Sequence, residues 1–450
     1  MYRLMFIQFI RTKTCQLGIA LALILGIISI MTGKQFLEDQ KKATSQVVEK
    51  QEAHIQRNLD LHKDDLGLLL YYLKFSVVNQ RDPLAALSIG QSDLNPGIQS
   101  VSILTLEGQK HDTDLVNPVK LLFGNLDLSF VFIYVFPLLI ITFTYNLRSE
   151  EEESGTWKIV STMSQSTTHF LLKKLLVRIS IIILLLFILY LAASIVLGIS
   201  ISINSALFIT IAILYQLFWF SLCFCIVTLR RNSNFNAVTL LSCWIVLTII
   251  LPSIVNNLVT VNYPVPEALT TMIKQRDGYH EKWDTDKRAT LEKFYSSYPQ
   301  LEKFGYPTDD GFNWHWYYAM QHLGDVESRV ESASMENKMI ERASVSSSWA
   351  QFIPSMHTQM SFNEIAGTNL QNHMSFLKEI SRFHEETRLY FYPKIFSEAS
   401  TETVQWEKFK PAYFQYTHSV NWLMELGPLV VVSLLFSCLA FFFIRKNQGV

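Results

Sequence analysis

Charged residues are scarce in this chain. They make up 17% of its 450 residues, whereas 49% are hydrophobic, and the mean hydropathy is +0.20. Soluble globular domains carry about 25% charged residues, so this composition excludes an ordinary soluble protein. It is also too polar for a chain that lies wholly inside a bilayer, and it predicts several membrane spans with sizeable water-exposed parts. The formal net charge of −1 shows no basic or acidic excess, so no nucleic-acid partner is expected.

Motifs for catalysis and nucleotide binding are missing. A phosphate-binding loop requires G-x-x-x-x-G-K-[ST], but the one Gly-Lys pair, Gly33-Lys34, ends an apolar run and is followed by Gln35. Neither H-E-x-x-H nor G-x-S-x-G occurs. We therefore expect a chain that is not an enzyme and binds no cofactor itself. Any ATP hydrolysis would be carried out by a separate protein.

Histidines provide the only hint of a metal site. Two pairs have spacings that bring both rings near one helix face: His315 with His322, and His373 with His384. Either pair has the ligand type for a metal ion, with Asp325 or Glu385 added. Surface or hydrogen-bonded histidines are far more common, so no metal site is predicted.

Cysteine is rare and is confined to the apolar parts of the chain. The five cysteines are Cys15, Cys223, Cys225, Cys243 and Cys438. None lies in a long polar segment, so no disulfide framework supports those segments. The C-x-C pair has no other soft ligand nearby, and we expect small buried hydrophobic residues there.

Six apolar runs are long enough to be transmembrane helices, since a helical span needs about 20 residues. They comprise residues 16–33, 127–146, 179–201, 205–229, 235–255 and 427–444. No small-x-small cleavage site follows the first run, so it is expected to be an uncleaved anchor rather than a signal peptide. Pro137 and Pro252 interrupt two of the runs and are expected to kink them.

Basic residues predict the orientation of these spans. With six spans, four basic groups fall on one side of the membrane: Arg3, Arg11 and Lys13; Arg148, Lys158, Lys173, Lys174 and Arg178; Arg230 and Arg231; Arg445 and Lys446. The positive-inside rule makes that side cytoplasmic. Residues 1–15, 147–178 and 445–450 are then cytoplasmic, and residues 34–126 and 256–426 are extracytoplasmic. The predicted fold is mainly α, polytopic, with two extracytoplasmic α+β or mostly helical domains.

The two outer segments contain recognisable helical and extended patterns. A helix is expected over 35–65, and the alternation over 98–106 predicts a strand. Phe376, Ile380, Phe383 and Tyr390 fall on one helix face. Aromatic residues are dense between 283 and 318, where they favour a domain core, with a belt on the membrane surface as the alternative.

An acidic run between the second and third apolar runs is the strongest candidate for a functional site. Residues 150–153 are all glutamate, and Gly155-Thr156 follow. Carboxylates are favoured at a helix N-terminus, and glycine permits a sharp turn. An amphipathic helix between two spans can dock into a groove on a cytosolic partner and transmit force to the membrane. A solvated charged loop is the alternative that the spacing leaves open.

The predicted spans contain almost no ionisable residues. Transporters of small ions or protons usually keep charged groups inside their spans. The interior here offers hydroxyl and amide groups, among them Ser205, Gln216 and Thr248. Our hypothesis is that any cargo is lipid-like or amphipathic.

A resemblance to a known family adds to this interpretation. The pattern Glu-x-Glu-x-Gly-Thr after a span, followed by a leucine-rich segment with Lys173 and Lys174, resembles type-2 ABC exporter permeases (the ABC-2 family). Further pieces are similar to a branch of that family that carries a domain of unknown function. They are Asp82–Gly90, Asp93–Pro96, Asn117–Leu122, Gly124–Leu128, Trp316–Gln321, Ala366–Thr368 and Phe391–Pro393.

The resemblance implies a permease subunit of an ATP-driven exporter in the bacterial inner membrane. Its partners would be ABC ATPase subunits, a second identical or related permease half, and membrane lipid. The family's ATPase-coupling positions correspond to Glu151, Glu153, Gly155 and Thr156. Family members often have a basic residue between the two acids, whereas Glu152 stands here, so docking is expected to depend more on basic residues of the ATPase. The alternatives are a mechanotransmitter, which drives an outer partner without transport, and a membrane enzyme or receptor without an ATPase.

Overall fold

The computed structural model describes residues 2–110, 125–163, 166–265, 281, 283, 285–307, 311–417 and 420–448. The Asn117–Leu122 piece of the resemblance lies outside the described residues.

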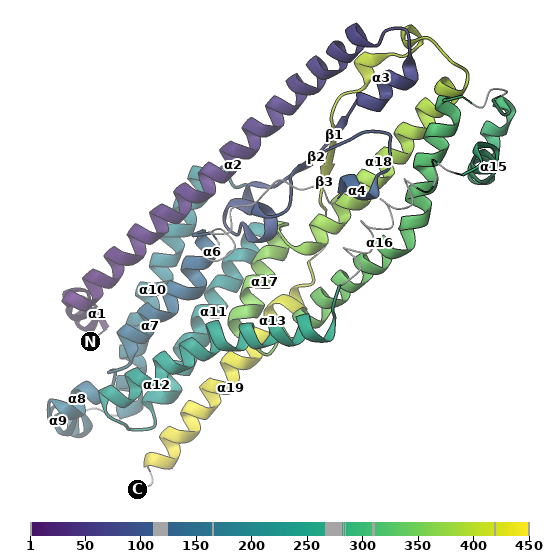
Figure 1. The fold of residues 1–450 in the computed structure, drawn as a ribbon. Coiled ribbons are helices and arrows are strands. Elements are labelled where there is room, and N and C mark those ends of the chain that lie inside the picture. The colour runs from purple at the N-terminus through teal and green to yellow at the C-terminus, as the bar shows by residue number, and fades with distance from the viewer. Residues whose placement is uncertain are drawn as a thin grey trace.

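Helices dominate the fold, both in the spans and outside them (Figure 1). The first group consists of the spans and the short helices beside them. Their elements are α1 (Tyr2–Ile10), α2 (Lys13–Leu61), α6 (Leu128–Phe130), a π-helical turn η3 (Val131–Val135), α7 (Phe136–Thr144), α8 (Ser149–Glu153), α9 (Trp157–Met163), α10 (Thr167–Leu197), α11 (Ile203–Val227), α12 (Ser233–Ile245), a second π-helical turn η4 (Val246–Ile250), α13 (Leu251–Asn262) and α19 (Trp422–Gln448).

The outer part contains the remaining helices and all three described strands. They are α3 (Leu66–Tyr72), β1 (Phe75–Gln80), η1 (Pro83–Ala86), η2 (Gly90–Asp93), β2 (Ile98–Val101), α4 (Glu107–Lys110), α15 (Lys287–Ser297), η5 (Pro299–Phe304), α16 (Trp314–Ala350), α17 (Pro354–Ala366), α18 (Leu370–Phe396), η6 (Thr401–Thr403), η7 (Trp406–Lys408) and β3 (Ala412–Gln415).

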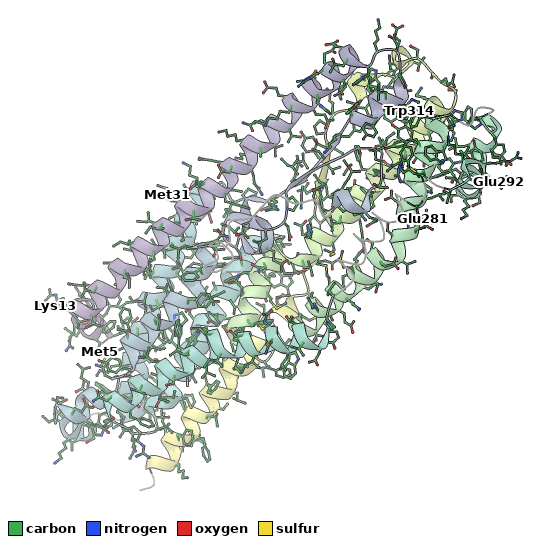
Figure 2. All side chains as sticks on the ribbon, in the orientation of Figure 1. Met5, Lys13, Met31, Glu281, Glu292 and Trp314 are labelled. Carbon is green, nitrogen blue, oxygen red and sulfur yellow. The ribbon has the colours of Figure 1, made fainter. Side chains whose placement is uncertain are left out.

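Six helices among the described residues are long and apolar enough to cross a bilayer. They are Lys13–Leu61, Leu128–Glu153, Thr167–Leu197, Ile203–Val227, Ser233–Asn262 and Trp422–Lys446. Each overlaps one of the six apolar runs, so the prediction of a mainly α, polytopic membrane protein is confirmed. Both termini, α8 and α9 lie at one end of the molecule, and α3 and α15 lie at the other (Figure 1). Figure 2 shows the same order along the molecule: Met5 and Lys13 at one end, Met31 midway along α2, and Trp314 at the far end.

Local sequence signals set the ends of the spans. Ser202 and Ser205 form a reciprocal capping box at the start of α11. Gly198 ends α10 in the left-handed region at φ 69°, where a residue with a Cβ is strained. These two caps explain why the chain between α10 and α11 can turn back within a few uncharged residues.

The two span prolines each follow a π-helical turn. Proline has no N–H, so in a π turn it leaves the carbonyl five residues earlier without a donor. For Pro137 that carbonyl belongs to Phe132, and it accepts a hydrogen bond from Gln216 Nε2 at 2.9 Å. For Pro252 it belongs to Leu247, and it accepts one from Ser355 Oγ. Side chains of other helices thus satisfy both carbonyls, as an apolar environment requires.

Helix α17 inserts between the spans, although it belongs to the second outer segment. Besides Ser355, it contributes Phe362, whose ring stacks on Phe208 of α11 with 4.1 Å between centroids. Phe362 and Ile365 are part of the same buried core as the span residues. The outer segment is therefore anchored in the membrane part of the protein.

Helix α2 runs without a break from the first span into the outer part. Its 49 residues correspond to about 74 Å at 1.5 Å per residue. Small residues allow close packing along it: a Cβ on Gly26 would lie 2.5 Å from Leu189, and one on Gly33 would lie 2.5 Å from the carbonyl oxygen of Ala86. The helix expected over 35–65 is thus a continuation of the first span.

The two outer segments share one sheet and one core. In the sheet order β2-β1-β3, β1 pairs antiparallel with β2 and parallel with β3, which places Val77 beside Ala412. Phe75 of the first segment packs with Phe391 of the second at 5.9 Å between ring centroids. Where the sequence suggests two outer domains, the structure joins both segments in one unit, which we call the outer unit. Of the strand expected over 98–106, residues 98–101 form β2.

The dense aromatic residues mostly form the core of the outer unit rather than a surface belt. Trp316, Tyr318 and Phe294 are buried there, and Trp283 is 44% exposed. On the predicted face of α18, Phe376 and Ile380 are buried, whereas Tyr390 is 40% exposed and contacts the Phe409 ring.

A buried ion pair holds the loop after β2 against α16 and α18. Arg388 Nη2 lies 2.8 Å from Asp325 Oδ2, and both side chains are almost fully buried. The guanidinium also donates to the carbonyls of Ile103 and Leu104, at 2.9 and 2.6 Å. Asp325 Oδ1 accepts the backbone N–H of Leu106 at 2.7 Å. Removing one partner of such a pair leaves a buried charge without compensation.

We expect Asp325→Asn to destabilise the protein strongly, on the order of 3–5 kcal/mol, because Arg388 would stay buried without its counter-charge. The measurement is thermal unfolding of the detergent-solubilised chain. Glu379→Gln is the matched control, since it removes a carboxylate paired with exposed Arg382 on the same helix α18, and it should change little. Equal losses in the two variants would contradict a special role for the buried pair.

Stability should also fall with acidification. Burial, reinforced by Arg388 and Arg329, lowers the pKa of His322 to about 3, and burial together with Arg388 places the pKa of His384 well below its usual value. Below pH ~6.5 the unfolded chain binds protons at these histidines and the folded chain does not, so stability is lost as pH drops from 7.5 to 5.5, by about 1 kcal/mol per histidine. The double variant His322→Gln, His384→Gln should show a flatter dependence of melting temperature on pH, and an unchanged slope would contradict this assignment.

Candidate functional site

The acidic run forms a short helical elbow between two spans. Helix α8 covers Ser149–Glu153, Gly155 turns the chain at φ 74°, and α9 begins at Trp157. We call residues Arg148–Trp157 the acidic elbow. The positive φ of Gly155 explains why a glycine occupies this position, because a residue with a Cβ is strained in the left-handed region. The sequence left open a docking helix or a solvated charged loop. The structure shows a helical element here rather than an irregular loop.

Glu151 connects the elbow to α10. Its Oε1 lies 2.6 Å from Lys174 Nζ, in a pair whose side chains are only 21% and 14% exposed. Thr156 Oγ1 donates to the other carboxylate oxygen, so the turn at Gly155 is closed across the glutamate. Two of the four predicted positions are therefore brought together by a direct contact.

Glu153 connects the elbow to α12. Its carboxylate accepts the backbone N–H of Ser233 at 2.8 Å and the Ser233 hydroxyl at 2.9 Å. Ser233 is the first residue of α12, where backbone N–H groups lack intrahelical partners and the helix dipole favours a negative charge. Ser149 adds a second link through its hydroxyl, 2.7 Å from that of Ser233.

Glu152 has a basic partner within the elbow. Arg148 Nε donates to Glu152 Oε1 at 2.8 Å, and the guanidinium lies over the Trp157 ring at 4.6 Å from its centroid. The pair spans one helical turn and closes the elbow on itself. The basic residue is thus present before the acidic run rather than within it.

The outer face of the elbow is open to solvent. Ser154, Gly155 and Thr156 are exposed, and a Cβ added at Gly155 would meet no atom within 4 Å. Two apolar side chains of α9 continue this face one turn apart: Ile159 is 59% exposed and Met163 is 82% exposed. We call residues 154–156 with Ile159 and Met163 the elbow face. Exposed apolar side chains beside acidic ones are typical of a protein interaction site.

The inner face of the elbow rests on the ends of three spans. Asn236 of α12 donates to the carbonyl of Tyr145 at 3.0 Å. Arg178 of α10 is buried, donates to the carbonyl of Phe143, and lies over the Phe9 ring of α1. These contacts fix α7, α10 and α12 around the elbow, so a displacement of the elbow would act on all three.

Three residues of this site were not predicted from the sequence: Arg148, Ser233 and Asn236. Asn232 and Ser233 follow Arg230-Arg231, and such residues often begin a helix, so the start of α12 could have been inferred. The contact of Ser233 with Glu153, however, joins positions 80 residues apart and has no sequence signal.

The histidine pairs take other roles. His322 Nδ1 lies 3.3 Å from the Tyr298 hydroxyl, and His384 Nε2 lies 2.9 Å from the carbonyl oxygen of Leu104. The His315 ring packs on Phe396. Among the described residues, no three His, Cys, Asp or Glu side chains form a group that could hold a metal ion. The five cysteines are free thiols, and Cys223 and Cys225 are buried among span residues.

Comparison with known proteins yields one match. Residues 269–417 match the family model of a domain of unknown function (DUF3526). The match covers much of the outer unit and ends before α19, and it does not include the acidic elbow. No curated protein and no solved structure matches the chain.

We expect Glu153→Ala to release the start of α12. The loss of a hydrogen bond to an exposed carboxylate costs about 1 kcal/mol, which corresponds to roughly five-fold faster hydrogen exchange at the first amides of α12. Exchange measured by mass spectrometry on peptides covering residues 233–240 tests this. Glu150→Ala is the control, because Glu150 lies in the same helix and its side chain has no hydrogen bond or ion pair to a described residue. If both variants behave alike, the Glu153–Ser233 contact does not hold the helix.

Proposed function

We propose that this protein is the permease subunit of an ATP-driven ABC exporter in a bacterial inner membrane, with the elbow face as the docking site for a separate ATPase subunit. The observation that carries the proposal is the double attachment of the elbow: Glu151 is bonded to α10 and Glu153 to α12, while the opposite face is open. An element built in this way receives force on one face and passes it to two spans on the other.

The chemistry of the elbow face favours a protein partner with a mixed groove. Ile159 and Met163 would enter an apolar pocket, and Gly155 lets the partner's backbone approach closely. Glu150, at the edge of this face, would meet a basic residue at the rim of the groove. An ATPase is the partner we propose, because the chain has no phosphate-binding loop of its own and the four elbow positions resemble the coupling element of ABC-2 permeases.

The same contacts extend from the elbow to the outer unit. Glu153 is bonded to the first residue of α12, and this span continues through η4, where the Leu247 carbonyl is bonded to Ser355 of α17. A push on the elbow would therefore reach the outer unit through one span and two hydrogen bonds. In the proposed topology, the termini and the elbow are cytoplasmic and the outer unit is extracytoplasmic.

A second permease half and lipid would cover the apolar faces of the spans. Exposed side chains form long stripes, including Leu17, Leu21 and Ile24 on α2 and Leu184, Phe187 and Leu191 on α10. Two polar side chains of the spans donate to backbone carbonyls: Gln216 Nε2 to that of Phe132, and Thr248 Oγ1 to that of Trp244 in its own helix. A lipid-like or amphipathic cargo is the class that suits these apolar surfaces.

A mechanotransmitter is the second candidate function, and helix α2 favours it. One continuous helix extends from the end that carries the elbow to the far end of the outer unit. ATP-driven tilting of the spans would move the outer unit on an external partner, without a cargo crossing the membrane. In sealed vesicles, the exporter transports a lipid-like cargo on ATP addition, whereas the mechanotransmitter hydrolyses ATP with no transport.

We expect Gly155→Trp to abolish ATPase docking. The side chain would project into the open space of the elbow face and keep the partner away. Gly198→Trp is the matched control: it introduces the same positive-φ strain, also into open space, but at the other end of α10. The tagged chain is purified from its native membranes, and ATP hydrolysis in the eluate is measured.

Hydrolysis should fall about ten-fold or more with Gly155→Trp and stay near the unsubstituted level with Gly198→Trp. If an ATPase with a phosphate-binding loop co-purifies equally well with both variants, the elbow face is not its docking site. If no such subunit accompanies even the unsubstituted chain, the exporter proposal itself is wrong.

A further inference from the structure

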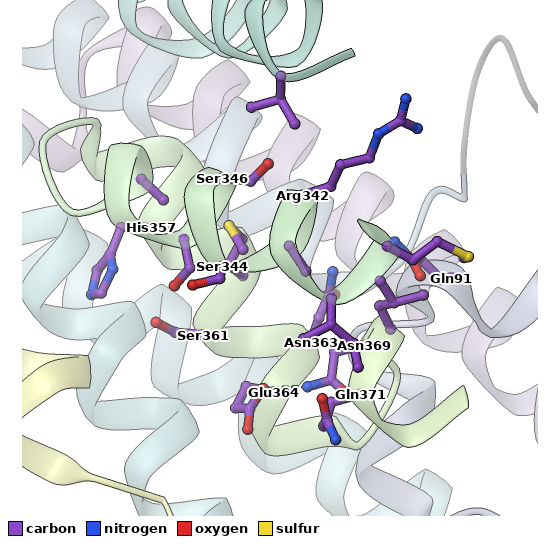
Figure 3. A pocket seen from close by; sticks show the side chains of 18 of the residues that line it. Gln91, Arg342, Ser344, Ser346, His357, Ser361, Asn363, Glu364, Asn369 and Gln371 are labelled. Carbon is purple, nitrogen blue, oxygen red and sulfur yellow. Dashed lines mark hydrogen bonds between the residues drawn. The ribbon is translucent and has the colours of Figure 1, made fainter. Parts of the chain in front are cut away.

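A cavity of about 740 Å³ lies where the outer unit meets the spans, and it is separate from the acidic elbow. Its walls come from α13, the C-terminal half of α16, α17, the start of α18 and the first turn of α19 (Figure 3). This volume is within the range of sites for small ligands. Because α13 and α19 are the ends of two membrane spans, the cavity lies at the level where the chain leaves the bilayer.

The lining is rich in uncharged hydrogen-bonding groups. Ser344 and Ser347 line it from α16, and Ser361 and Asn363 line it from α17. Met339, Met360 and Met424 add flexible apolar side chains that adapt to irregular shapes. A polar wall with apolar patches suits a ligand that has both a polar headgroup and an apolar part.

The charges of the described lining residues favour a cationic group. Arg342 donates to the carbonyls of Tyr263 and Thr260, and in Figure 3 its side chain extends away from the cluster around Asn363 and Asn369. Two carboxylates, Glu364 and Glu425, also line the cavity. The guanidinium is thus engaged at the end of α13, and a ligand would meet the acidic groups.

Glu425 has an unused acceptor. Its Oε2 atom is buried and has no hydrogen-bond partner among the described residues. The residue is held in place by His357, which is 6% exposed and whose Nε2 lies 2.8 Å from the Glu425 carbonyl oxygen. A buried carboxylate oxygen without a donor is costly, so a ligand that supplies an N–H would be favoured there.

Apolar side chains border the cavity on the membrane side. On α13, Leu258 is 46% and Val261 is 69% exposed, beside the lining residues Val259 and Thr260. On α19, Leu423 is 81% exposed, beside Met424 and Glu425. At the ends of two spans these surfaces face lipid, so the apolar part of a ligand can remain in the bilayer while its headgroup enters the cavity.

We propose that this cavity binds an amphiphile with a primary ammonium in its headgroup, as in an ethanolamine phospholipid of the adjacent leaflet. The ammonium donates to the carboxylate of Glu425, and the serine hydroxyls and side-chain amides of the lining donate to the headgroup's ester and phosphate oxygens. The acyl chains pass out along Leu258 and Leu423. This site goes beyond the proposed coupling function, since it needs neither ATP nor the ATPase.

The test is lipid binding to the purified full-length chain in detergent, followed by native mass spectrometry. Dihexanoyl phosphatidylethanolamine is compared with phosphatidylcholine of the same chain length, whose ammonium has no N–H, and with the corresponding phosphatidylglycerol, which has no amine. Glycerophosphoethanolamine, which has the headgroup without acyl chains, is the fourth probe. We expect the ethanolamine lipid to bind at least ten-fold more tightly than the other three.

Two pairs of variants locate the site. Glu425→Gln should remove the preference for ethanolamine, whereas Glu49→Gln, on the exposed outer part of α2, should retain it. Ser347→Trp should fill the cavity and weaken binding about ten-fold, whereas Ser348→Trp, at the neighbouring exposed position that does not line the cavity, should not. The other three changes, Glu49→Gln, Ser347→Trp and Ser348→Trp, affect exposed residues, so misfolding would not mask the result.

Three outcomes would overturn the proposal. Equal affinity for the ethanolamine and choline lipids would remove the role of the N–H donor. Tight binding of glycerophosphoethanolamine would show that the apolar border is not used. Equal effects of Ser347→Trp and Ser348→Trp would place the bound lipid elsewhere on the protein. The assay contains no ATP and no partner, so its result is independent of whether the elbow docks an ATPase.

Discussion

The absence of water inside a bilayer is the constraint on which this structure depends most. Every backbone carbonyl there needs a donor from the protein, and a proline removes one. The two span prolines leave the carbonyls of Phe132 and Leu247 without a backbone donor, and the side chains of Gln216 and Ser355 donate to them instead. The first bond joins two spans, and the second joins a span to the outer unit. The insertion of α17, and with it the cavity beneath the outer unit, follows from the second.

The acidic elbow and the cavity lie at the two ends of one span. The N-terminus of α12 receives Glu153, and α13, in the same span, forms a wall of the cavity. In the π turn between them, η4, the Leu247 carbonyl accepts a hydrogen bond from Ser355 of α17. Movement of the elbow and occupancy of the cavity would therefore act on the same helix, and a ligand in the cavity has a physical route by which to affect the elbow.

The sequence predicted the spans well because their signal is local. About 20 apolar residues between polar flanks define a span without knowledge of its neighbours. The two span prolines lie just after π-helical turns, which the sequence did not predict. The pairing of Val77 with Ala412 could not be predicted, since each strand is short and the partners lie in different segments. The elbow positions came from a family resemblance, but their contacts with the spans could not be predicted. Nothing in the sequence around Ser233 indicates that it contacts Glu153. The exposure of Tyr390 shows the limit of helical periodicity, which gives a face but not how far the neighbouring elements cover it.

Helix α2 determines what kind of motion the protein can make. A continuous helix of about 74 Å does not lengthen, so the motion that couples its two ends is a tilt of the whole helix. Gly33 packs directly against the backbone of Ala86, where a Cβ would lie 2.5 Å from the carbonyl oxygen, and this close contact can serve as a pivot. About 30 Å of helix lies on one side of Gly33 and about 42 Å on the other. A small tilt about this point would swing the far tip in the opposite direction to the near end, and by about 1.4 times the distance. The geometry of one close-packed glycine thus converts a displacement at the membrane end into a larger, reversed one at the far end of the outer unit.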